Sequence, residues 1–394
     1  EKCFRQAKNE ILSANASFGT VQSFLVKIEG ANPGSTINFE AQDGEFLRAF
    51  LCPSMCVNAF RNSTRVIALD GCHIKAKYGG VILAATVLDG NGSVFPAAVG
   101  VAESENEETW RWFLRLLTFA LQINDDGDGM VVLSDREKGL KKAVKAYLRR
   151  ASHSYCVFYI LKNVKGKYHC GFDGLIFQAA KASHLDDFNK AMETMKSLHR
   201  AASKYIEDTK PEGWARALFP VKRFGHVTSN MAECMNKWFG ESRYLDPVAF
   251  FRAYTVKLNC MFEKRRLLYS KLEDDDVPKK VAAIIEKAMD EGDVLKITQH
   301  TGDIFEVQRK TVATAMPVVD LSKMTCTCGF FIEHGVPCRH MCKAATSICV
   351  HPNTLVIPER CVGVLKRTYQ GFFVPVDVND LKDDGTNPPT KTKK

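Results

Sequence analysis

The apolar pattern between positions 64 and 155 constrains the fold of this chain more than any other feature. Three apolar runs, "RVIALDG", "GGVILAATVLDGNGS" and "VFPAAVGVA", follow one another with an Asn-Gly turn after the second. Short apolar runs bounded by turn residues predict buried strands. The segment "SENEETWRWFLRLLTFALQ" then repeats its apolar residues at helical spacing, and "MVVLSDREKG" returns to the strand pattern. This alternation predicts an α/β fold.

The long connection before the fourth strand predicts where that strand lies. The first three strands are joined by short turns, which favours an antiparallel meander. A strand reached through a helical crossover returns parallel to an earlier strand with a right-handed connection. If that neighbour is the first strand, Asp70 and Asp135, which end the first and fourth runs, lie side by side at one edge of the sheet.

Beyond about residue 165 helical spacing replaces the strand pattern. "HLDDFNKAMETMKSLHRAASKYIED" and "TSNMAECMNKWFG" both have apolar residues on one helical face. No apolar run approaches the ~18 residues of a membrane span, so no membrane partner is expected. The expected order is a lead-in region (1–60), an α/β core (61–165), an α-helical insertion (166–225), a helical segment (226–292), a cysteine-containing region (293–350) and a C-terminal tail that is partly disordered (351–394).

The segment "CTCGFFIEHGVPCRH" carries the ligands of a metal site. Cys326 and Cys328 are two residues apart, nine residues follow, and Cys338 and His340 are again two apart. Residues i and i+2 of an extended segment point the same way, so each pair can reach one ion. Three thiolates and one imidazole complete a closed tetrahedral zinc site, which is therefore structural. The alternatives are a substitute ligand or unrelated buried residues. The two possible substitutes are His334 and Cys342.

Asp70 and Asp135 have a candidate partner in Glu233, within "TSNMAECMN". Phosphoryl transfer on nucleic acids commonly uses two divalent cations, ~3.5–4 Å apart, held by carboxylates. Mg²⁺ or Mn²⁺ suits such a site because Mg²⁺ binds few carboxylates and keeps several waters. Each residue also has a structural interpretation. Asp70 precedes Gly71 in a turn, Asp135 caps the next helix, and Glu233 closes a capping box with Asn230.

Several extended segments occur in the order found in one transposase family. "LDGCHIKAKYGGVILAATVLDGNGSVFPAAVGVAESENEETWRWFLRLL", "LSDREKGLKKAV" and "TSNMAECMNKW" closely resemble the Mutator-like element (MULE) transposases over roughly residues 45–345. The Cys-x-Cys-x9-Cys-x-His spacing, with Pro337 before the third ligand, resembles the SWIM zinc finger. The resemblance implies a ribonuclease H-like catalytic domain with an all-α insertion before the last acidic residue. Carried over, Asp70, Asp135 and Glu233 match the DDE residues of the family.

That resemblance implies a metal-dependent DNA transposase that cuts DNA and joins it to a target. Its cofactors would be structural Zn²⁺ and catalytic Mg²⁺ or Mn²⁺. Its partners would be transposon ends, target DNA and further copies of the chain, and its location the nucleus. SWIM fingers bind DNA or protein, and the resemblance does not say which.

One position departs from the family pattern. The family usually carries Cys-x-x-His after the fifth strand, whereas Cys156 is followed at that spacing by Tyr159. A phenol does not readily replace an imidazole as a metal ligand or proton carrier near neutral pH. A second hypothesis is therefore a transposase-derived DNA-binding or regulatory protein that no longer catalyses. A third is a zinc-dependent protein-interaction module on an inert scaffold.

The net charge of +9 suits a polyanionic partner such as DNA but does not by itself indicate one. Two groups of basic residues are candidates for phosphate contacts, with a solvated helix face as the alternative for each. They are Lys138, Lys141, Lys142, Lys145, Arg149 and Arg150 in the first, and Lys264, Arg265 and Arg266 in the second. Trp110 and Trp112 are expected to be a core and a surface residue, and Trp238 a core residue.

Overall fold

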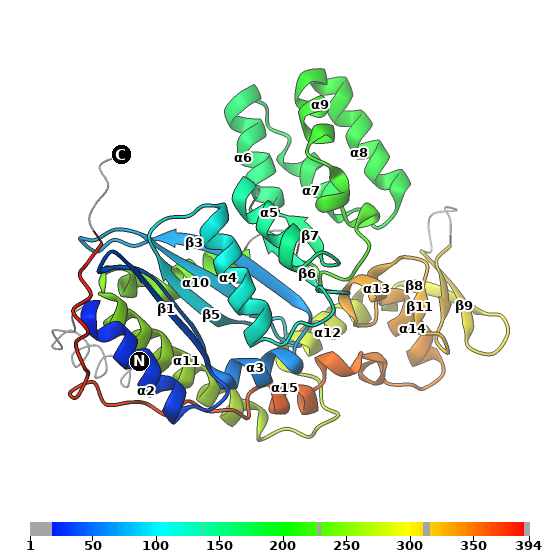
Figure 1. Ribbon diagram of the computed structural model, residues 1–394. Helices are drawn as coiled ribbons and strands as arrows, with labels where there is room; N and C mark the ends of the chain where they lie inside the picture. Colours follow the sequence, from blue (N-terminus) through cyan, green and yellow to red (C-terminus); the bar gives the residue numbers. More distant parts are fainter. Residues whose placement is uncertain (1–17, 136, 227–229, 310–315, 390–394) are drawn as a thin grey trace.

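The computed structural model describes residues 18–135, 137–226, 230–309 and 316–389, without the side chains of residues 230, 232, 233 and 309. These residues form a mixed α/β molecule around a seven-stranded sheet of order β1-β2-β5-β4-β3-β6-β7 (Figure 1). Its strands are β1 (Thr36–Gln42), β2 (Glu45–Cys52), β3 (Val66–His73), β4 (Val81–Leu88), β5 (Val94–Ala102), β6 (Val131–Ser134) and β7 (Ser152–Tyr155). None of the helices described is both long and apolar enough to cross a membrane.

The central strands have the predicted topology. β3, β4 and β5 form an antiparallel meander, and β6 pairs parallel with β3 after the crossover through α4 (Glu107–Ala120). The register pairs Val66 with Val131 and Ala68 with Leu133. β7 then adds parallel to β6. The prediction that the fourth run returns beside the first is therefore confirmed.

The N-terminal region extends the same sheet, which the sequence did not predict. β2 pairs antiparallel with β5, and β1 pairs antiparallel with β2. β1 is half-buried along most of its length, so its apolar pattern is weak. These strands bury Trp112, expected at the surface, whose indole Nε1 donates to Asn38 Oδ1 at 2.8 Å. The flanking helices are η1 (Phe18–Thr20), α2 (Val21–Ala31) and α3 (Ser54–Arg61).

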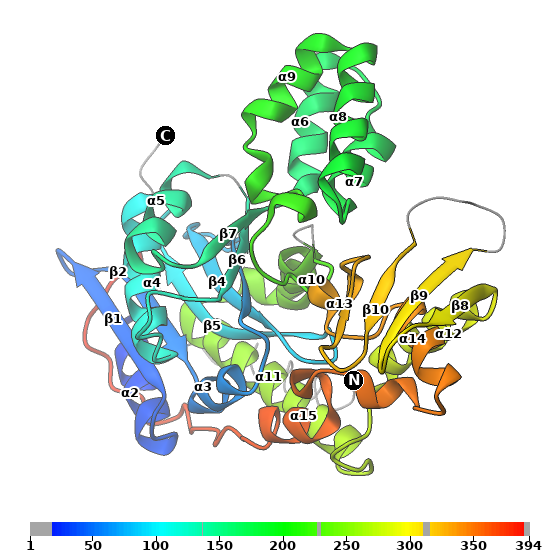
Figure 2. The same ribbon diagram turned by 90° about the vertical axis from the view of Figure 1, so that its right-hand side faces the viewer.

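Helices cover both faces of the sheet (Figures 1 and 2). α4 and α5 (Lys138–Tyr147) lie on one face, and α10 (Asn230–Phe239) and α11 (Pro247–Tyr269) on the other. Trp110, Phe113 and Leu117 of α4 are fully buried, as their helical spacing predicts. On α10, Met231 and Met235 are buried, and Trp238, expected in the core, is half-buried.

A group of four helices stands away from the sheet around its own apolar core (Figure 1). They are α6 (Val157–Tyr168), α7 (Asp173–Lys181), α8 (Leu185–Leu198) and α9 (Arg200–Asp208), followed by η2 (Pro211–Gly213) and η3 (Arg216–Leu218). After α10 come η4 (Gly240–Tyr244), α11 and α12 (Lys279–Asp293), which leads to a second, four-stranded sheet of described residues. That part contains β8 (Leu295–Gln299), β9 (Ile304–Arg309), β10 (Val318–Asp320), β11 (Thr325–Cys326), α13 (Phe330–His334) and α14 (Arg339–Ser347).

The C-terminal residues return to the main core. η5 (Pro352–Leu355) and η6 (Pro358–Arg360) lead into α15 (Val362–Thr368), which buries Val362 and Leu365 in that core. The chain then runs back to the β1–β2 hairpin, where Asn387 N–H donates to the Gly44 carbonyl at 2.9 Å. A partly disordered tail was expected for 351–394. The described part of this range, residues 351–389, contains η5, η6, α15 and the returning segment, and residues 390–394 lie outside the described residues.

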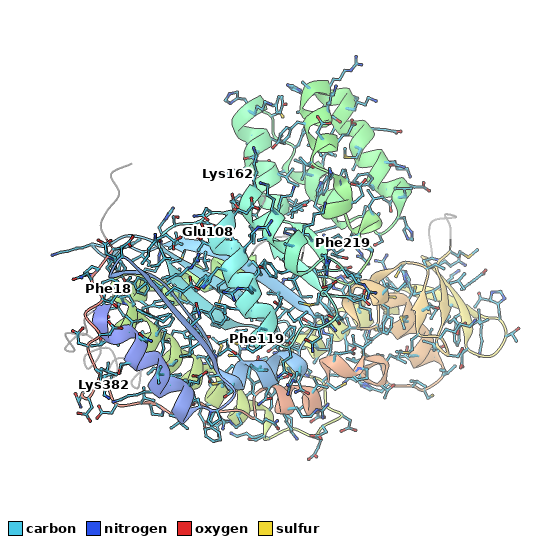
Figure 3. The ribbon with its side chains drawn as sticks, viewed as in Figure 1. Phe18, Glu108, Phe119, Lys162, Phe219 and Lys382 are labelled. Atoms are coloured by element: carbon cyan, nitrogen blue, oxygen red, sulfur yellow. The ribbon has the colours of Figure 1, made fainter. Side chains whose placement is uncertain are left out.

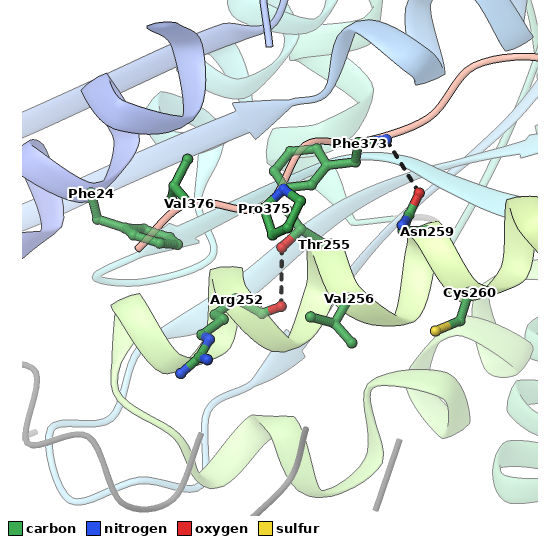
Figure 4. A pocket seen from close by; sticks show the side chains of 9 residues that line it. All are labelled: Phe24, Arg252, Thr255, Val256, Asn259, Cys260, Phe373, Pro375 and Val376. Atoms are coloured by element: carbon green, nitrogen blue, oxygen red, sulfur yellow. Dashed lines mark hydrogen bonds between the residues drawn. The ribbon is translucent and has the colours of Figure 1, made fainter. Parts of the chain in front are cut away.

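This returning segment contacts α2 and α11. Its Lys382 lies beside α2, with the backbone N–H donating to Ser23 Oγ at 3.0 Å (Figure 3). Where the segment crosses α11, a pocket of about 260 Å³ lies between Phe24, Val256 and Phe373 (Figure 4).

Hydrogen bonds also join the turn between β4 and β5 to residues of the C-terminal region. Asp89 is 1% exposed, and its Oδ2 accepts a hydrogen bond from the Tyr369 hydroxyl at 2.6 Å. Arg265 Nη1 donates to the same hydroxyl at 2.6 Å and lies 3.9 Å from Asp89 Oδ2. Arg360 Nε donates to the Gly90 carbonyl at 2.9 Å. These contacts join residues as far as 280 positions apart in the sequence.

Candidate active site and zinc centre

Asp70 and Asp135 lie at equivalent positions of neighbouring parallel strands. The pairing of Val66 with Val131 and of Ala68 with Leu133 sets an offset that also aligns position 70 with position 135. Neighbouring strands are about 4.8 Å apart. The two aspartates are therefore side by side, as the topology predicts.

Both aspartates face α10. Alternate residues of a strand point to the same side of the sheet. Val66, Ala68, Val131 and Leu133 share one apolar cluster with Met231 of α10. Because Asp70 and Asp135 continue these alternating series, they lie on the face that α10 covers.

Asn236 of α10 reaches the first aspartate directly. Its side-chain amide donates to Asp70 Oδ2 at 2.8 Å. Glu233 is part of the same helix, and its side chain lies outside the described residues. Positions three apart on a helix share a face, so position 233 lies one turn from the residue that contacts Asp70. The backbone thus brings all three predicted positions to one region.

The electrostatic environment of the aspartates is unfavourable for their charged forms. Burial, together with the charges of Asp135 and Glu105, raises the pKa of Asp70 to about 7, against the hydrogen bond from Asn236. Burial also raises the pKa of Asp135, although Glu137 N–H donates to its Oδ1 at 3.0 Å. Among the described residues, no Lys, Arg or His nitrogen lies within 4.0 Å of either carboxylate. Uncompensated carboxylates of this kind favour a bound cation.

A further carboxylate, Glu105, lies beside this pair and was missed by the sequence reasoning. A Cβ atom built at Gly71 would be 2.7 Å from Glu105 Oε2. Trp110 Nε1 donates to Glu105 Oε1 at 3.2 Å. In the sequence Glu105 resembles an ordinary acidic residue before a helix. The available signal was Gly71, since a glycine inside a strand often marks the close approach of another group.

The predicted zinc ligands converge. Among the described side chains, Cys326, Cys328, Cys338 and His340 are the one set of His, Cys, Asp or Glu residues with at least three ligand atoms all within 4.8 Å of one another. A closed set of three sulfurs and one nitrogen fits structural zinc and offers no position for a substrate.

Local structure explains how the zinc ligands meet. His340 Nδ1 lies 3.7 Å from Cys326 Sγ and 3.8 Å from Cys338 Sγ, so Nδ1 is the nitrogen that faces the sulfurs. Cys338 caps α14, where it accepts from Met341 N–H at 3.5 Å. The hydrogen bonds among the three thiols lower the pKa of Cys328 and raise the pKa of Cys338. One thiolate is thus favoured within the set, and bound zinc would favour deprotonation of the others.

The two possible substitute ligands, His334 and Cys342, make contacts with other residues. The ring of His334 stacks on Phe330 with centroids 4.1 Å apart, and Cys342 Sγ contacts the Pro337 carbonyl at 4.0 Å. Neither belongs to the converging set.

An imidazole lies near the acidic site, although not at the position the family pattern gives. Cys156 precedes α6 and Tyr159 lies in its first turn. His153 of β7 instead places its Nε2 2.7 Å from the hydroxyl of Ser134, the residue before Asp135. Burial lowers the pKa of His153 to about 4, so it is neutral near pH 7.

The basic groups divide into paired and unpaired residues. Arg265 Nη2 donates to the Val94 carbonyl at 2.9 Å and Arg266 Nη2 to the Gly371 carbonyl at 3.4 Å, so both stabilise the fold. On and after α5, Lys142, Arg149 and Arg150 form ion pairs with Glu107, Asp126 and Asp128 respectively. Lys138, Lys145 and Lys264 are exposed and stay candidates for phosphate contacts.

Comparison with protein-family models identifies a MULE transposase domain at residues 66–163 and a SWIM zinc finger at residues 314–349. The first range contains Asp70, Asp135 and Glu105, and the second contains the four converging zinc ligands. Glu233 lies outside both ranges. No curated protein matches the chain. The sequence resemblance to a MULE transposase with a SWIM finger is thereby confirmed at the level of these two domains.

Proposed function

We propose that this chain, with its MULE transposase domain and SWIM zinc finger, is a DDE-type DNA transposase. Its α/β core would be the ribonuclease H-like catalytic domain, and α6–α9 the all-α insertion before the last acidic residue. Asp70, Asp135 and Glu233 would hold Mg²⁺ or Mn²⁺. The observation that carries the proposal is the register of β3 and β6, which places two half-buried aspartates side by side facing α10.

The proposed reaction is hydrolysis of a phosphodiester bond followed by attack of the freed 3′-hydroxyl on target DNA. Divalent cations bound at the site would activate the attacking oxygen and stabilise the leaving one. Asp70 lies within a strand and Asp135 directly after one, so both carboxylates start from rigid backbone. Asn236 orients Asp70, and the apolar cluster around Val66, Leu133 and Met231 excludes water beneath the pair.

The other proposed properties follow from the same assignment. Zinc bound by the SWIM finger would be structural. The partners would be transposon ends and target DNA, the active form a homo-oligomer, and the location the nucleus.

A cleavage assay tests the proposed function. Labelled DNA carrying the inverted repeats that flank the source element would be incubated with the full chain and Mg²⁺ or Mn²⁺. We expect metal-dependent nicking that Asp135→Asn reduces by at least about a thousandfold, because charge stabilisation in the transition state is lost. The control is Asp125→Asn, a half-buried residue away from the two aspartates that pairs with Arg65 at 2.8 Å. Equal activity of wild type and Asp135→Asn would exclude this mechanism.

The alternative is a catalytically inactive DNA-binding or regulatory protein, and Tyr159 is the residue that favours it. Salt-sensitive DNA binding without cleavage by the wild type in either metal would support it.

A further inference from the structure

We propose that Glu105 is a further carboxylate ligand of the cation site formed by Asp70 and Asp135. This inference rests on the proposed function and adds a residue that approaches the site from the opposite face of β3.

The Glu105 carboxylate occupies space that only a glycine at position 71 leaves open. A Cβ atom at Gly71 would be 2.7 Å from Glu105 Cδ and Oε2 and 2.8 Å from Oε1. Gly71 follows Asp70 directly, and consecutive strand residues point to opposite faces. The carboxylates of Asp70 and Glu105 therefore approach the same point of β3 from its two sides.

The strand pairing leaves this part of β3 accessible to both groups. The ladder between β3 and β6 ends at Ala68 and Leu133 among the described residues. Beyond it, β6 stops at Ser134 and Asp135 follows. The edge of β3 at Asp70 and Gly71 is thus the place where a cation can meet carboxylates from both faces.

The protein fixes one oxygen of Glu105 and leaves the other available. The indole Nε1 of Trp110, a residue with no exposed surface, donates to Oε1 at 3.2 Å. Among the described residues Oε2 has no hydrogen-bond donor. A carboxylate held at one oxygen and free at the other has the form of a monodentate metal ligand.

Among the described residues Glu105 forms no ion pair within 4.0 Å, in contrast to the glutamates that follow it. Glu107 pairs with Arg111 at 3.0 Å and with Lys142 at 2.7 Å, and Glu108 lies 3.5 Å from Arg48. Among the described residues Glu105 has no such partner. Burial and the charges of Asp135 and Glu137 raise its pKa, against the hydrogen bond from Trp110 and the charge of His73. A favourable position before the N-terminus of α4 explains an acidic residue here, but it does not explain why this one lies close to two aspartates and forms no ion pair among the described residues.

The test measures cation binding separately from cleavage. Zinc-loaded full-length protein would be titrated with Mn²⁺, and free Mn²⁺ followed by electron paramagnetic resonance. We expect Glu105→Gln to weaken Mn²⁺ binding by about tenfold or more. The matched control is Glu108→Gln in the first turn of α4, labelled in Figure 3 and largely exposed, which should bind as wild type does.

The outcomes separate the two proposals. Wild-type Mn²⁺ affinity in Glu105→Gln, together with weakened binding in Asp135→Asn, would overturn the role of Glu105 and leave the proposed function standing. Unchanged binding in both variants would overturn both. Circular dichroism of each variant shows whether it is folded, and Glu105→Asp, which keeps the charge, should regain part of the affinity if the carboxylate is a ligand.

Discussion

At the scale of single residues, the acidic site stores unfavourable electrostatic energy. The pKa of Asp70 is raised from 3.8 to about 7 by burial and by neighbouring carboxylates. A folded-state pKa above the unfolded value means that the folded protein binds the proton more tightly. Protonation of Asp70 therefore favours the folded state. This contribution to the free energy of unfolding is fully present below about pH 4 and is lost as pH rises through 7.

We predict that Asp70→Asn stabilises the protein in zinc-containing buffer without Mg²⁺ or Mn²⁺. The expected gain at pH 8 is about 1–2 kcal/mol, after allowance for solvent screening, or a few degrees in Tm. The gain should shrink toward pH 4, where Asp70 of the wild type is protonated. Thermal unfolding at both pH values measures it, with Asp125→Asn as control. A lower Tm for Asp70→Asn at pH 8 would show that this carboxylate is well compensated.

A second prediction concerns Gly71. Its φ is not in the left-handed region, so alanine is acceptable to the backbone, and the effect of Gly71→Ala comes from displacing Glu105. Gly71→Ala should weaken Mn²⁺ binding about as much as Glu105→Ala, about tenfold. Because both changes remove one interaction, the double variant should be no weaker than either single variant. Additive losses in Mn²⁺ titrations would show that the residues act independently.

What the sequence could predict at this scale depended on how far apart the interacting residues are. The zinc ligands span 15 positions and were predicted from spacing, while Asp70 and Asp135 needed only one correct strand pairing. Glu105 was missed because its role depends on contact with Gly71 across the sheet. Whether Glu233 joins them stays a prediction, since its side chain lies outside the described residues.

At the scale of elements, the zinc finger is bound to the segment that leads into α10. Gly225 N–H donates to Glu333 Oε1 of α13 at 3.2 Å, and Arg216 Nη2 donates to the Gly329 carbonyl at 2.7 Å. Arg360 Nη1 donates to the His334 carbonyl at 2.6 Å. The finger therefore helps to position the residues that precede the proposed catalytic glutamate.

Two neutral histidines at this junction predict sensitivity to acid. Burial, with nearby Arg360, Lys280 and Arg216, lowers the pKa of His226 and of His334 to about 4. The unfolded chain binds these protons below about pH 6.5, so stability falls as pH drops from 6.5 toward 4. We predict that the Tm loss between pH 7.5 and 5 is smaller in His226→Gln.

Thermal unfolding at the two pH values measures that loss, and a chromophoric chelator records zinc release in parallel. The control is His351→Gln, an exposed residue beyond the finger. An identical loss in wild type and His226→Gln would place the acid sensitivity in the zinc ligands instead.

Elements were predicted where their periodicity was strong. The meander, the crossover helix and β6 have a clear apolar periodicity in the sequence. The segments of β1 and β2 have no such periodicity. Their pairing to β5 is a tertiary effect, because the half-buried β1 is defined by its neighbour and not by its own apolar alternation.

At the scale of the whole molecule, the zinc ligands are part of the packing of the small second sheet. Cys326 and Cys338 belong to the apolar cluster of that part, so losing zinc removes packing as well as ligand bonds. We predict that Cys338→Ser abolishes zinc binding and lowers Tm by at least about 5 °C. Exposed Cys349→Ser should change neither. Metal analysis and thermal unfolding measure both, and a Cys338→Ser protein that retains zinc would contradict the ligand assignment.

The contacts of Asp89 have a consequence for how the protein is made. This carboxylate belongs to an early hairpin, yet the hydroxyl that satisfies it comes from a residue synthesised 280 positions later. On the ribosome this carboxylate stays solvated until synthesis has passed Tyr369 and that residue has emerged. Messages cut short before α15 would yield chains with a permanently exposed apolar surface, the kind that chaperones retain and proteases remove.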